Sequence, residues 1–403
     1  MRSAAAVAAP RLRLVRAAEA PRTTAKAQAE RSMRRVLALL TLSVSVLTLA
    51  GLVMVLSASS VSAFAAYGSS FLFFKRQLLY AALGSVAALG ASRLRYQVWQ
   101  RAWAPLLAVT FILLLLVLHP GSGTSAGGAA RWLELGPFSL QPSEFAKFAV
   151  VASLAAIIAR NQKRLNNPIQ WLLPVLLIVG GISALILFQP DLGTMMIIAL
   201  TAFVLLFVAG VRLRLLALWA LLSCMAGMAL VLAEGYRRAR VFSFLHPWAD
   251  PRNSGYQIVQ SLIALGSGRL FGVGLGASRQ KWMYVPNAHT DFIFAILGEE
   301  LGLIGEVVVL ALFGGLIACG IRIALRAPDT FGRLLASGIT IWIGLQALVN
   351  LGAVTGLLPI TGVPLPFVSF GGSSLVVSLG AVGVLISVGR AAVPSAARSK
   401  RRR

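Results

Sequence analysis

The sequence predicts an all-α polytopic membrane protein with about ten transmembrane helices. Of its 403 residues, 58% are hydrophobic and only 12% are charged, whereas a soluble domain carries about 25% charge. Apolar runs of roughly 18 or more residues recur along the whole chain, and each is long enough to cross about 30 Å of hydrocarbon. These observations exclude a disordered chain and argue against a soluble globular domain.

The first seven predicted helices follow one another with short connections. The first begins after a basic segment that is rich in alanine and arginine, and the fourth begins at Pro142, which suits a first helical turn. The fifth and sixth are separated only by the turn QPDL. We expect these helices at 36–57, 71–91, 103–119, 142–159, 170–189, 192–210 and 215–234.

The last three predicted helices follow a long connection over about 235–290. They are expected at 291–320, 334–357 and 373–389, and the stretch LPITGVPLPFVSFGG at 358–372 separates the last two. The chain therefore divides into a basic tail over 1–35 that we expect to be disordered, a ten-helix membrane domain over 36–390 with its large loop at 235–290, and a second basic tail over 391–403.

The distribution of basic residues predicts the orientation. An even number of helices places both tails on one side, and these tails with the short connections on that side hold 26 of the 37 Lys and Arg residues. The positive-inside rule puts this side in the cytoplasm. The net charge of +25 is explained by this pattern, so we expect the membrane and not nucleic acid as the partner of these residues.

Acidic residues indicate that function lies at the outer face, because nine of the twelve lie in outer loops or in helices at or below that face. Asp291 follows the loop residues Val285–Thr290 and precedes the apolar run FIFAIL. A helix N-cap is one interpretation, because Asp is among the best capping residues. A carboxylate in that place is also well positioned to act as a general base.

Glu299, Glu300 and Glu306 lie in the helix that Asp291 precedes. Residues seven apart share a face of a continuous helix, so Glu299 and Glu306 are expected on one face with Glu300 one step round. Structural polar pairing is the first interpretation of all three, and cation binding is the alternative.

The motif QPSEFAK places Glu144 in a first helical turn, where the helix dipole favours a carboxylate. Lys147 lies three residues further on, so an intrahelical salt bridge is one interpretation and a ligand site is the other. Arg131 and Trp132 precede the motif, and a guanidinium beside an aromatic ring suits a phosphate or a sugar. Asp191 in QPDLGT lies between two closely spaced helices, as a capping residue or as part of a hinge or lipid path.

The long outer loop gathers basic residues, aromatic residues and glycine, a composition that suits an anionic ligand such as a pyrophosphate. Arg240 and Lys281 belong to this group. Contacts of long basic side chains with lipid headgroups are the alternative explanation. No cluster of histidine residues indicates a zinc site, and the identity of any metal is left open.

Taken together, these motifs resemble the SEDS family (shape, elongation, division and sporulation), polytopic glycosyltransferases that build peptidoglycan. The resemblance covers roughly residues 36–390 and rests on RW before LELGPFSLQPSEFAK, and on QPDLGT, YRRARVFSFLHPWADP, GYQIVQSLIALGSG, PNAHTDFIFAILGEELGLIG and TGVPLPFVSFGGSSL. AHTDFIF followed by GEELG resembles the division branch more than the elongation branch. Asn287 replaces a usual Glu, and Arg269 stands where a second Gly is common.

The resemblance implies polymerisation of lipid II at the outer face of the bacterial inner membrane, at the division septum. The 4-hydroxyl of one sugar attacks the anomeric carbon of the lipid-linked chain, undecaprenyl pyrophosphate leaves, and the anomeric centre inverts. Asp291 is then the general base. Arg240 and Lys281, with Mg²⁺ or Mn²⁺ and no organic cofactor, neutralise the leaving group. Further residues implied to bind the substrate are Arg131, Trp132, Glu144, Lys147, His289 and Thr290.

The resemblance also implies partners and leaves two alternatives. The expected partners are lipid II, the nascent lipid-linked glycan, a class B penicillin-binding transpeptidase and division regulatory proteins. A lipid II flippase is the first alternative, since intramembrane carboxylates also suit transport. Transport predicts charge along a path through the bilayer, whereas the charge here collects at the outer face. A non-catalytic division scaffold is the second alternative, and it predicts that the loss of Asp291 is tolerated.

Overall fold

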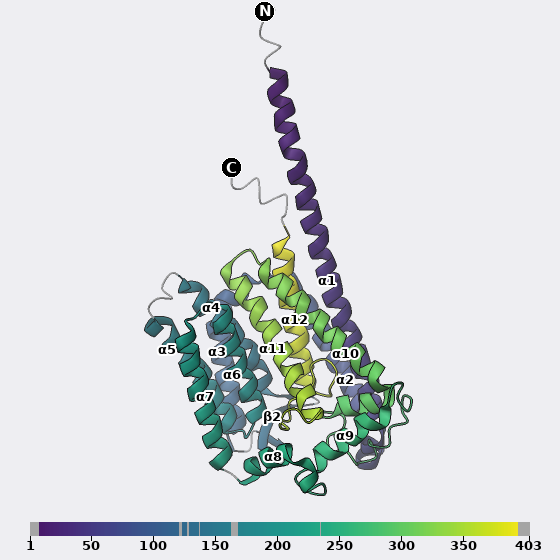
Figure 1. Cartoon of the computed structure of the whole chain (residues 1–403). Coiled ribbons are helices and arrows are strands. Elements are labelled where there is room, and N and C mark those ends of the chain that lie inside the picture. Colours follow the sequence, from purple (N-terminus) through teal and green to yellow (C-terminus); the bar gives the residue numbers. More distant parts are fainter. Residues whose placement is uncertain are drawn as a thin grey trace, which may run out of the picture.

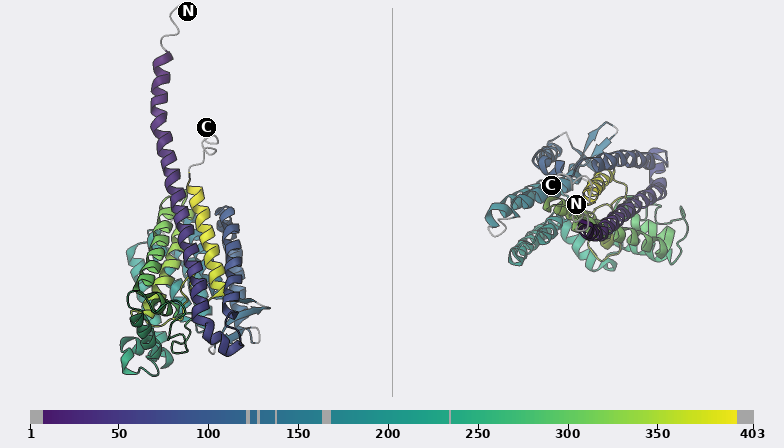
Figure 2. Two further views of the ribbon diagram at one scale, coloured as in Figure 1. Left: turned by 90° about the vertical axis from the view of Figure 1, so that its right-hand side faces the viewer. Right: turned by 90° about the horizontal axis from the view of Figure 1, so that it is seen from above.

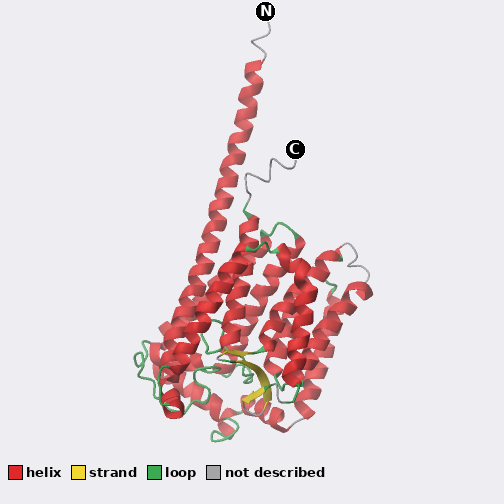
Figure 3. Ribbon diagram, turned by 180° about the vertical axis from the view of Figure 1, so that it is seen from behind, coloured by secondary structure: helices red, strands yellow, loops and turns green. Residues whose placement is uncertain are grey.

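The computed structural model describes residues 8–120, 123–126, 129–136, 138–162, 168–233 and 235–393. Long helices stand side by side in a bundle, and α1 begins at the same end of the bundle at which α12 ends (Figure 1). The opposite end carries α8, α9 and a small β-sheet (Figures 1 and 3). The long connections and the chain ends therefore lie at opposite ends of the molecule, as the even number of helices predicts.

All ten predicted membrane segments are helical. They are α1 (Ala8–Tyr67), α2 (Leu72–Arg93), α3 (Gln97–Leu118), α4 (Pro142–Arg160), α5 (Pro168–Leu187), α6 (Leu192–Val208), α7 (Leu213–Ala233), α10 (Ile293–Leu325), α11 (Thr330–Val354) and α12 (Gly372–Ala392). In the described part of the chain, eight are long and apolar enough to cross a membrane, while Leu172–Leu187 and Leu192–Val208 are apolar but shorter. The predicted fold class is confirmed, and the side that faces the cytoplasm stays a prediction.

The basic N-terminal segment differs from the disordered tail that the sequence predicts. α1 runs without interruption from Ala8 to Tyr67, so residues 8–35 extend the first membrane helix beyond the bundle (Figure 2). The segment is rich in alanine and arginine, which favour helix, and extending an existing helix avoids the cost of a new nucleus. Residues 1–7 and most of the predicted C-terminal tail, 394–403, lie outside the described residues.

The connection between α3 and α4 forms a β-sheet that an all-α prediction lacks. The strands β1 (Thr124–Ala126), β2 (Ala129–Leu135) and β3 (Phe138–Leu140) are antiparallel in that order. The chain turns at Gly136, whose φ of 64° suits glycine, and buried Leu133 pairs with Leu140. Strands this short leave too little alternation in the sequence to be recognised.

The long connection between α7 and α10 also folds, into α8 (Gly235–Leu245), the short 3-10 helix η2 (Pro247–Ala249) and α9 (Tyr256–Gly268). The segment after α9 forms backbone hydrogen bonds with α10 at a point where that helix is interrupted. Gly302 has φ 65° and ψ −169°, which interrupts the helix. The freed amides of Leu303 and Ile304 donate to the carbonyls of Arg269 and Leu270 at 2.9 and 3.3 Å.

α4 is the most buried of these eight long apolar helices, because 89% of its apolar 18-residue stretch is buried inside the protein. It packs on α3, α6 and α11, while α2 packs on α12 and α1 on α10 (Figure 2). Since α4 begins at the end that carries the sheet, its first turn lies close to the long connections. This arrangement places QPSEFAK at the centre of the bundle, not at its lipid-facing surface.

Candidate functional site

The triplet His289-Thr290-Asp291 forms a tight turn just before α10. Asn287 has a positive φ of 56°, and its carbonyl accepts hydrogen bonds from the amide and hydroxyl of Thr290 at 3.0 and 3.1 Å. Asn adopts this conformation more readily than most residues, which gives a backbone reason for its presence at this position. Phe292, not Asp291, holds the N-cap position of α10.

Contacts from three other elements fix this turn. The carbonyl of His289 accepts from the amide of Phe370 at 2.9 Å, and the carbonyl of Asp291 accepts from Asn350 Nδ2 at 2.8 Å. The His289 ring packs against Phe73 and Phe370, with ring centroids 4.7 and 5.7 Å apart. Burial lowers the pKa of His289 from 6.5 to about 4, so the imidazole is neutral at pH 7.

The loop between α11 and α12, residues 355–371, lies against Asp291. Gly362 has φ 72°, and a Cβ added there would lie 3.5 Å from Asp291 Oδ2. The carbonyls of the next two residues, Val363 and Pro364, accept hydrogen bonds from two amide side chains of α11. This part of the chain therefore approaches the carboxylate closely enough to define the space around it.

Glu144 and Lys147 form a buried ion pair in the first turn of α4. Lys147 Nζ lies 2.8 Å from Glu144 Oε1, and both side chains are 2% exposed. The ammonium also donates to Gln346 Oε1 at 2.8 Å and lies 5.4 Å from the centre of the Trp342 ring. Glu144 Oε2 is buried without a hydrogen-bond partner among the described residues. The intrahelical salt bridge is confirmed, and one carboxylate oxygen is left over.

The QPDLGT turn meets the same loop. Asp191 caps α6 by accepting from the Thr194 amide at 3.0 Å, which confirms the capping interpretation. Arg131 donates to the carbonyls of Gln189 and Pro190 at 2.9 and 2.6 Å. A Cβ on Gly193 would lie only 2.5 Å from the Thr361 carbonyl. Arg131 thus holds the turn in place, and the turn packs against the loop beside Asp291.

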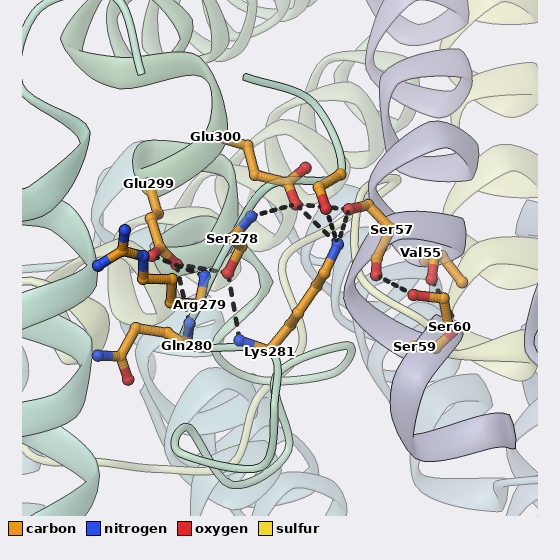
Figure 4. Close-up of polar contacts among 11 residues, drawn as sticks. Val55, Ser57, Ser59, Ser60, Ser278, Arg279, Gln280, Lys281, Glu299 and Glu300 are labelled. Atoms are coloured by element: carbon orange, nitrogen blue, oxygen red, sulfur yellow. Dashed lines mark hydrogen bonds and ion pairs between the residues drawn. The ribbon is translucent and has the colours of Figure 1, made fainter. Parts of the chain in front are cut away.

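Glu299 and Glu300 belong to a second, separate cluster at the break in α10 (Figure 4). Glu299 accepts from the Ser278 hydroxyl and from the amides of Arg279 and Gln280. Glu300 Oε1 accepts from Ser57 Oγ of α1 at 2.6 Å and lies 3.5 Å from Lys281 Nζ.

Lys281 is committed to this cluster. Its ammonium also donates to Ser57 Oγ at 3.3 Å and to the Gly276 carbonyl, and the residue is 7% exposed. A buried ammonium with three partners serves the packing of the loop against α1. The structure therefore gives Lys281 a different setting from the leaving-group contact that the sequence predicts.

The remaining predicted residues fall in three settings. Glu306 is half-buried and lies beyond the break at Gly302. The prediction that Glu299 and Glu306 share one continuous helical face is therefore wrong. The carboxylate of Glu306 lies beside Gly298. Trp132 is half-buried on β2. The side chain of Arg240 lies outside the described residues.

Sequence patterns did not predict a role for Gln346 and Asn350 of α11, or for Ser57 and Ser278 of the second cluster. The two amides had a signal, because they lie four residues apart in an otherwise apolar run and therefore share a helix face. The two serines had none, since single serines are common in membrane helices and loops.

Comparisons with known proteins agree on one family. The model of the FtsW/RodA/SpoVE family, described as a cell cycle protein, matches residues 37–393. Stage V sporulation protein E of Bacillus subtilis (strain 168) is 48% identical over 84% of this chain and 93% of its own length. A probable peptidoglycan glycosyltransferase FtsW of Geobacter sp. (strain M18) is 46% identical over 85% of this chain and 94% of its own length.

Two solved structures have the same fold. A chain from a study of how a peptidoglycan synthase complex coordinates polymerization and crosslinking has a TM-score of 0.73 and 30% identity, covering 88% of this chain and 98% of its own. The rod shape determining protein RodA of Thermus thermophilus has a TM-score of 0.64 and 29% identity, covering 88% and 97%.

Proposed function

This chain belongs to the FtsW/RodA/SpoVE family of cell cycle proteins, and on that premise we propose that it is a peptidoglycan glycosyltransferase that polymerises lipid II during cell division. The names of its relatives and the helical membrane fold support the reaction class. The arrangement of Asp291 carries the proposal for the site: its backbone is tied to α11, and its carboxylate lies beside Gly362, at the bundle end that carries the long loops.

In the proposed step, the 4-hydroxyl of the GlcNAc unit of one lipid II attacks the anomeric carbon of the MurNAc unit at the end of the lipid-linked chain. The new C–O bond forms as the bond to pyrophosphate breaks, and the proton of the hydroxyl passes to the Asp291 carboxylate. A sugar hydroxyl is a poor nucleophile, so a positioned base contributes roughly 10²–10⁴-fold. Attack opposite the leaving group inverts the anomeric centre.

The surrounding residues supply position and charge in this proposal. The buried Glu144–Lys147 pair lies under the same loop as Asp291, since Lys147 and the Pro364 carbonyl share Gln346 as a partner. Arg131 shapes the QPDLGT turn, and His289 holds the Asp291 turn as a neutral ring. Because Lys281 is buried and paired, we assign charge neutralisation of the leaving pyrophosphate to Arg240 and the other arginines of the long loop.

We keep Mg²⁺ or Mn²⁺ as a proposal for the substrate, not for a resident site. Among the described residues, no three His, Cys, Asp or Glu side chains gather at one place. Mg²⁺ commonly needs only one or two carboxylates, because substrate phosphates and water complete its coordination. A divalent ion would enter with the pyrophosphate, and activity against added metal after chelation would test this.

The family context supports a class B penicillin-binding transpeptidase as the partner, division regulators as further partners, and the septum as the location. One of the two similar solved structures comes from a peptidoglycan synthase complex that coordinates polymerization and crosslinking. Copurification with the cognate transpeptidase and fluorescence microscopy of a tagged chain in dividing cells would test these proposals.

The decisive experiment compares wild type with Asp291→Asn in detergent, each with and without the cognate transpeptidase, on lipid II with Mg²⁺ or Mn²⁺. Glycan polymer on a gel from wild type and none from Asp291→Asn, with both equally folded and partner-bound, supports Asp291 as the base. Equal polymer from both variants would refute that role. Polymer from neither preparation would favour the flippase or the scaffold, and translocation of lipid II in vesicles would separate those two.

A further inference from the structure

Two amide side chains stand one turn apart on the buried face of α11. Gln346 is 0% exposed and Asn350 is 2% exposed. Burying an amide is costly unless its polar atoms are hydrogen-bonded. The partners of these two side chains therefore show why the chain keeps them in a helix that could otherwise be filled with apolar residues.

Asn350 donates both hydrogens of its amide to backbone carbonyls that lie outside its own helix. Nδ2 lies 2.8 Å from the Asp291 carbonyl and 2.8 Å from the Val363 carbonyl. The first carbonyl belongs to the proposed base, and the second lies one residue from Gly362, where an added Cβ would lie 3.5 Å from Oδ2 of that base. One amide thus joins the start of α10 to the loop beside it.

Gln346 makes the equivalent connection for the ion pair of α4. Its Nε2 donates to the Pro364 carbonyl at 3.0 Å, and its Oε1 accepts from Lys147 Nζ at 2.8 Å and from Trp342 Nε1 at 2.9 Å. The two amides therefore bond to consecutive carbonyls of one loop, while their other contacts reach Asp291 and Lys147 on two different segments.

These contacts differ from ordinary polar packing in a membrane helix. Thr340 lies on the same helix and is 4% exposed, and the one hydrogen bond of its side chain within the described part of the chain goes to the Ala336 carbonyl of its own helix. That hydrogen bond fixes no other element. The bonds of Asn350 fix the main chain of the residue that carries the reacting carboxylate, and a displacement of 1 Å at a reacting group can cost about 10²-fold in rate.

We propose that Asn350 is a positioning residue for Asp291, and that Gln346 plays the same part for Lys147. The inference rests on the proposed function, because it assigns Asn350 a task through the base of that reaction. It predicts a loss of turnover without a loss of substrate binding, since both hydrogen bonds that Asn350 donates go to main-chain carbonyls.

The test uses full-length protein with its cognate transpeptidase and lipid II, and compares wild type, Asn350→Leu, Asn350→Ser and the control Thr340→Val. Initial rates over a range of lipid II concentrations give kcat and KM, and thermal melting in detergent reports folding. We expect kcat to fall at least tenfold in both Asn350 variants with KM within about twofold. Thr340→Val should keep both constants.

A double-mutant cycle with Asp291→Glu separates positioning from a general loss of structure. A carboxylate that is already displaced gains nothing from Asn350, so the second substitution should lower kcat far less in that background than in wild type. Additive losses, an unchanged kcat in both Asn350 variants, or a rise in KM alone would overturn the proposal. If the Leu variant does not fold, the Ser variant decides. Absence of polymer from wild type would instead count against the proposed function.

Discussion

Replacing Arg269 with glycine is expected to stabilise the protein, although most substitutions by glycine destabilise. Arg269 follows α9 with φ 47° and ψ −140°, a region that residues with a Cβ rarely occupy and that costs about 1–3 kcal/mol. Glycine relieves this strain but loses roughly 0.5–1 kcal/mol more in conformational entropy on folding. The midpoints of these two ranges leave a net gain of about 1 kcal/mol.

The structure shows why the chain accepts the strain. The Arg269 carbonyl is the acceptor for the Leu303 amide at the break in α10, so the backbone there must keep this course whatever the side chain is. The side chain itself is exposed, and its removal costs little packing. Gly268 before it leaves no room for a Cβ, because that atom would lie 1.9 Å from the Gly298 carbonyl.

Thermal melting of the purified protein in detergent measures the effect. For a chain of this size, a gain of about 1 kcal/mol corresponds to a rise in Tm of roughly 1 °C. Arg269→Ala keeps the strain and should melt near wild type. Arg279→Gly, at an exposed position without a positive φ, should melt lower. The reasoning is refuted if Arg269→Gly melts at or below wild type, or if Arg269→Ala gains as much.

Three further predictions concern the two clusters. Glu300→Gln leaves the buried ammonium of Lys281 without its counter-charge and should lower the free energy of unfolding by about 3–5 kcal/mol in melting experiments. The double variant Glu300→Gln/Lys281→Met should recover part of this stability. A loss of stability in the double variant as large as in the single variant would contradict the role of the ion pair. Gly362→Ala places a methyl group beside Asp291 Oδ2 and should lower polymer yield at least tenfold, whereas Gly68→Ala, with a similar φ of 70° in open space, should not. Burial lowers the pKa of His289 to about 4, so the folded protein favours the neutral ring. The free energy of unfolding should therefore be complete above about pH 6.5 and fall as the pH drops toward 4, by at most about 3 kcal/mol. Wild type should lose more stability than His289→Phe between pH 7 and 4, and equal losses in the two proteins would contradict this role of His289.

The sequence predicts the membrane helices well because hydrocarbon imposes a single strong requirement, an apolar run of sufficient length. It cannot predict the break in α10. Gly302 is one of 38 glycines, and only the approach of the Arg269–Gly274 backbone shows that the helix opens there. Seven-residue spacing therefore misplaced Glu306 relative to Glu299.

The candidate site is predictable in part for the same reason. Asp291, Glu144 and Lys147 stand out because charge is rare in this chain, and a rare buried charge needs a partner. Lys281 stands out equally, but it bonds to Ser57 of α1, which lies 224 residues away in the sequence, as well as to Glu300. No local pattern could assign it to packing instead of to the pyrophosphate.

The two clusters explain together why carboxylates concentrate around the segment that carries Asp291. Glu299 and Glu300 bond to Ser278, Arg279, Gln280 and Lys281, so they tie together the two ends of the stretch from 281 to 299. Asn350 and Phe370 hold its middle at Asp291 and His289. A segment fixed at both ends and at its centre leaves its carboxylate little freedom. Substitutions in the end cluster should therefore lower stability and turnover together, whereas substitutions at the centre should lower turnover first.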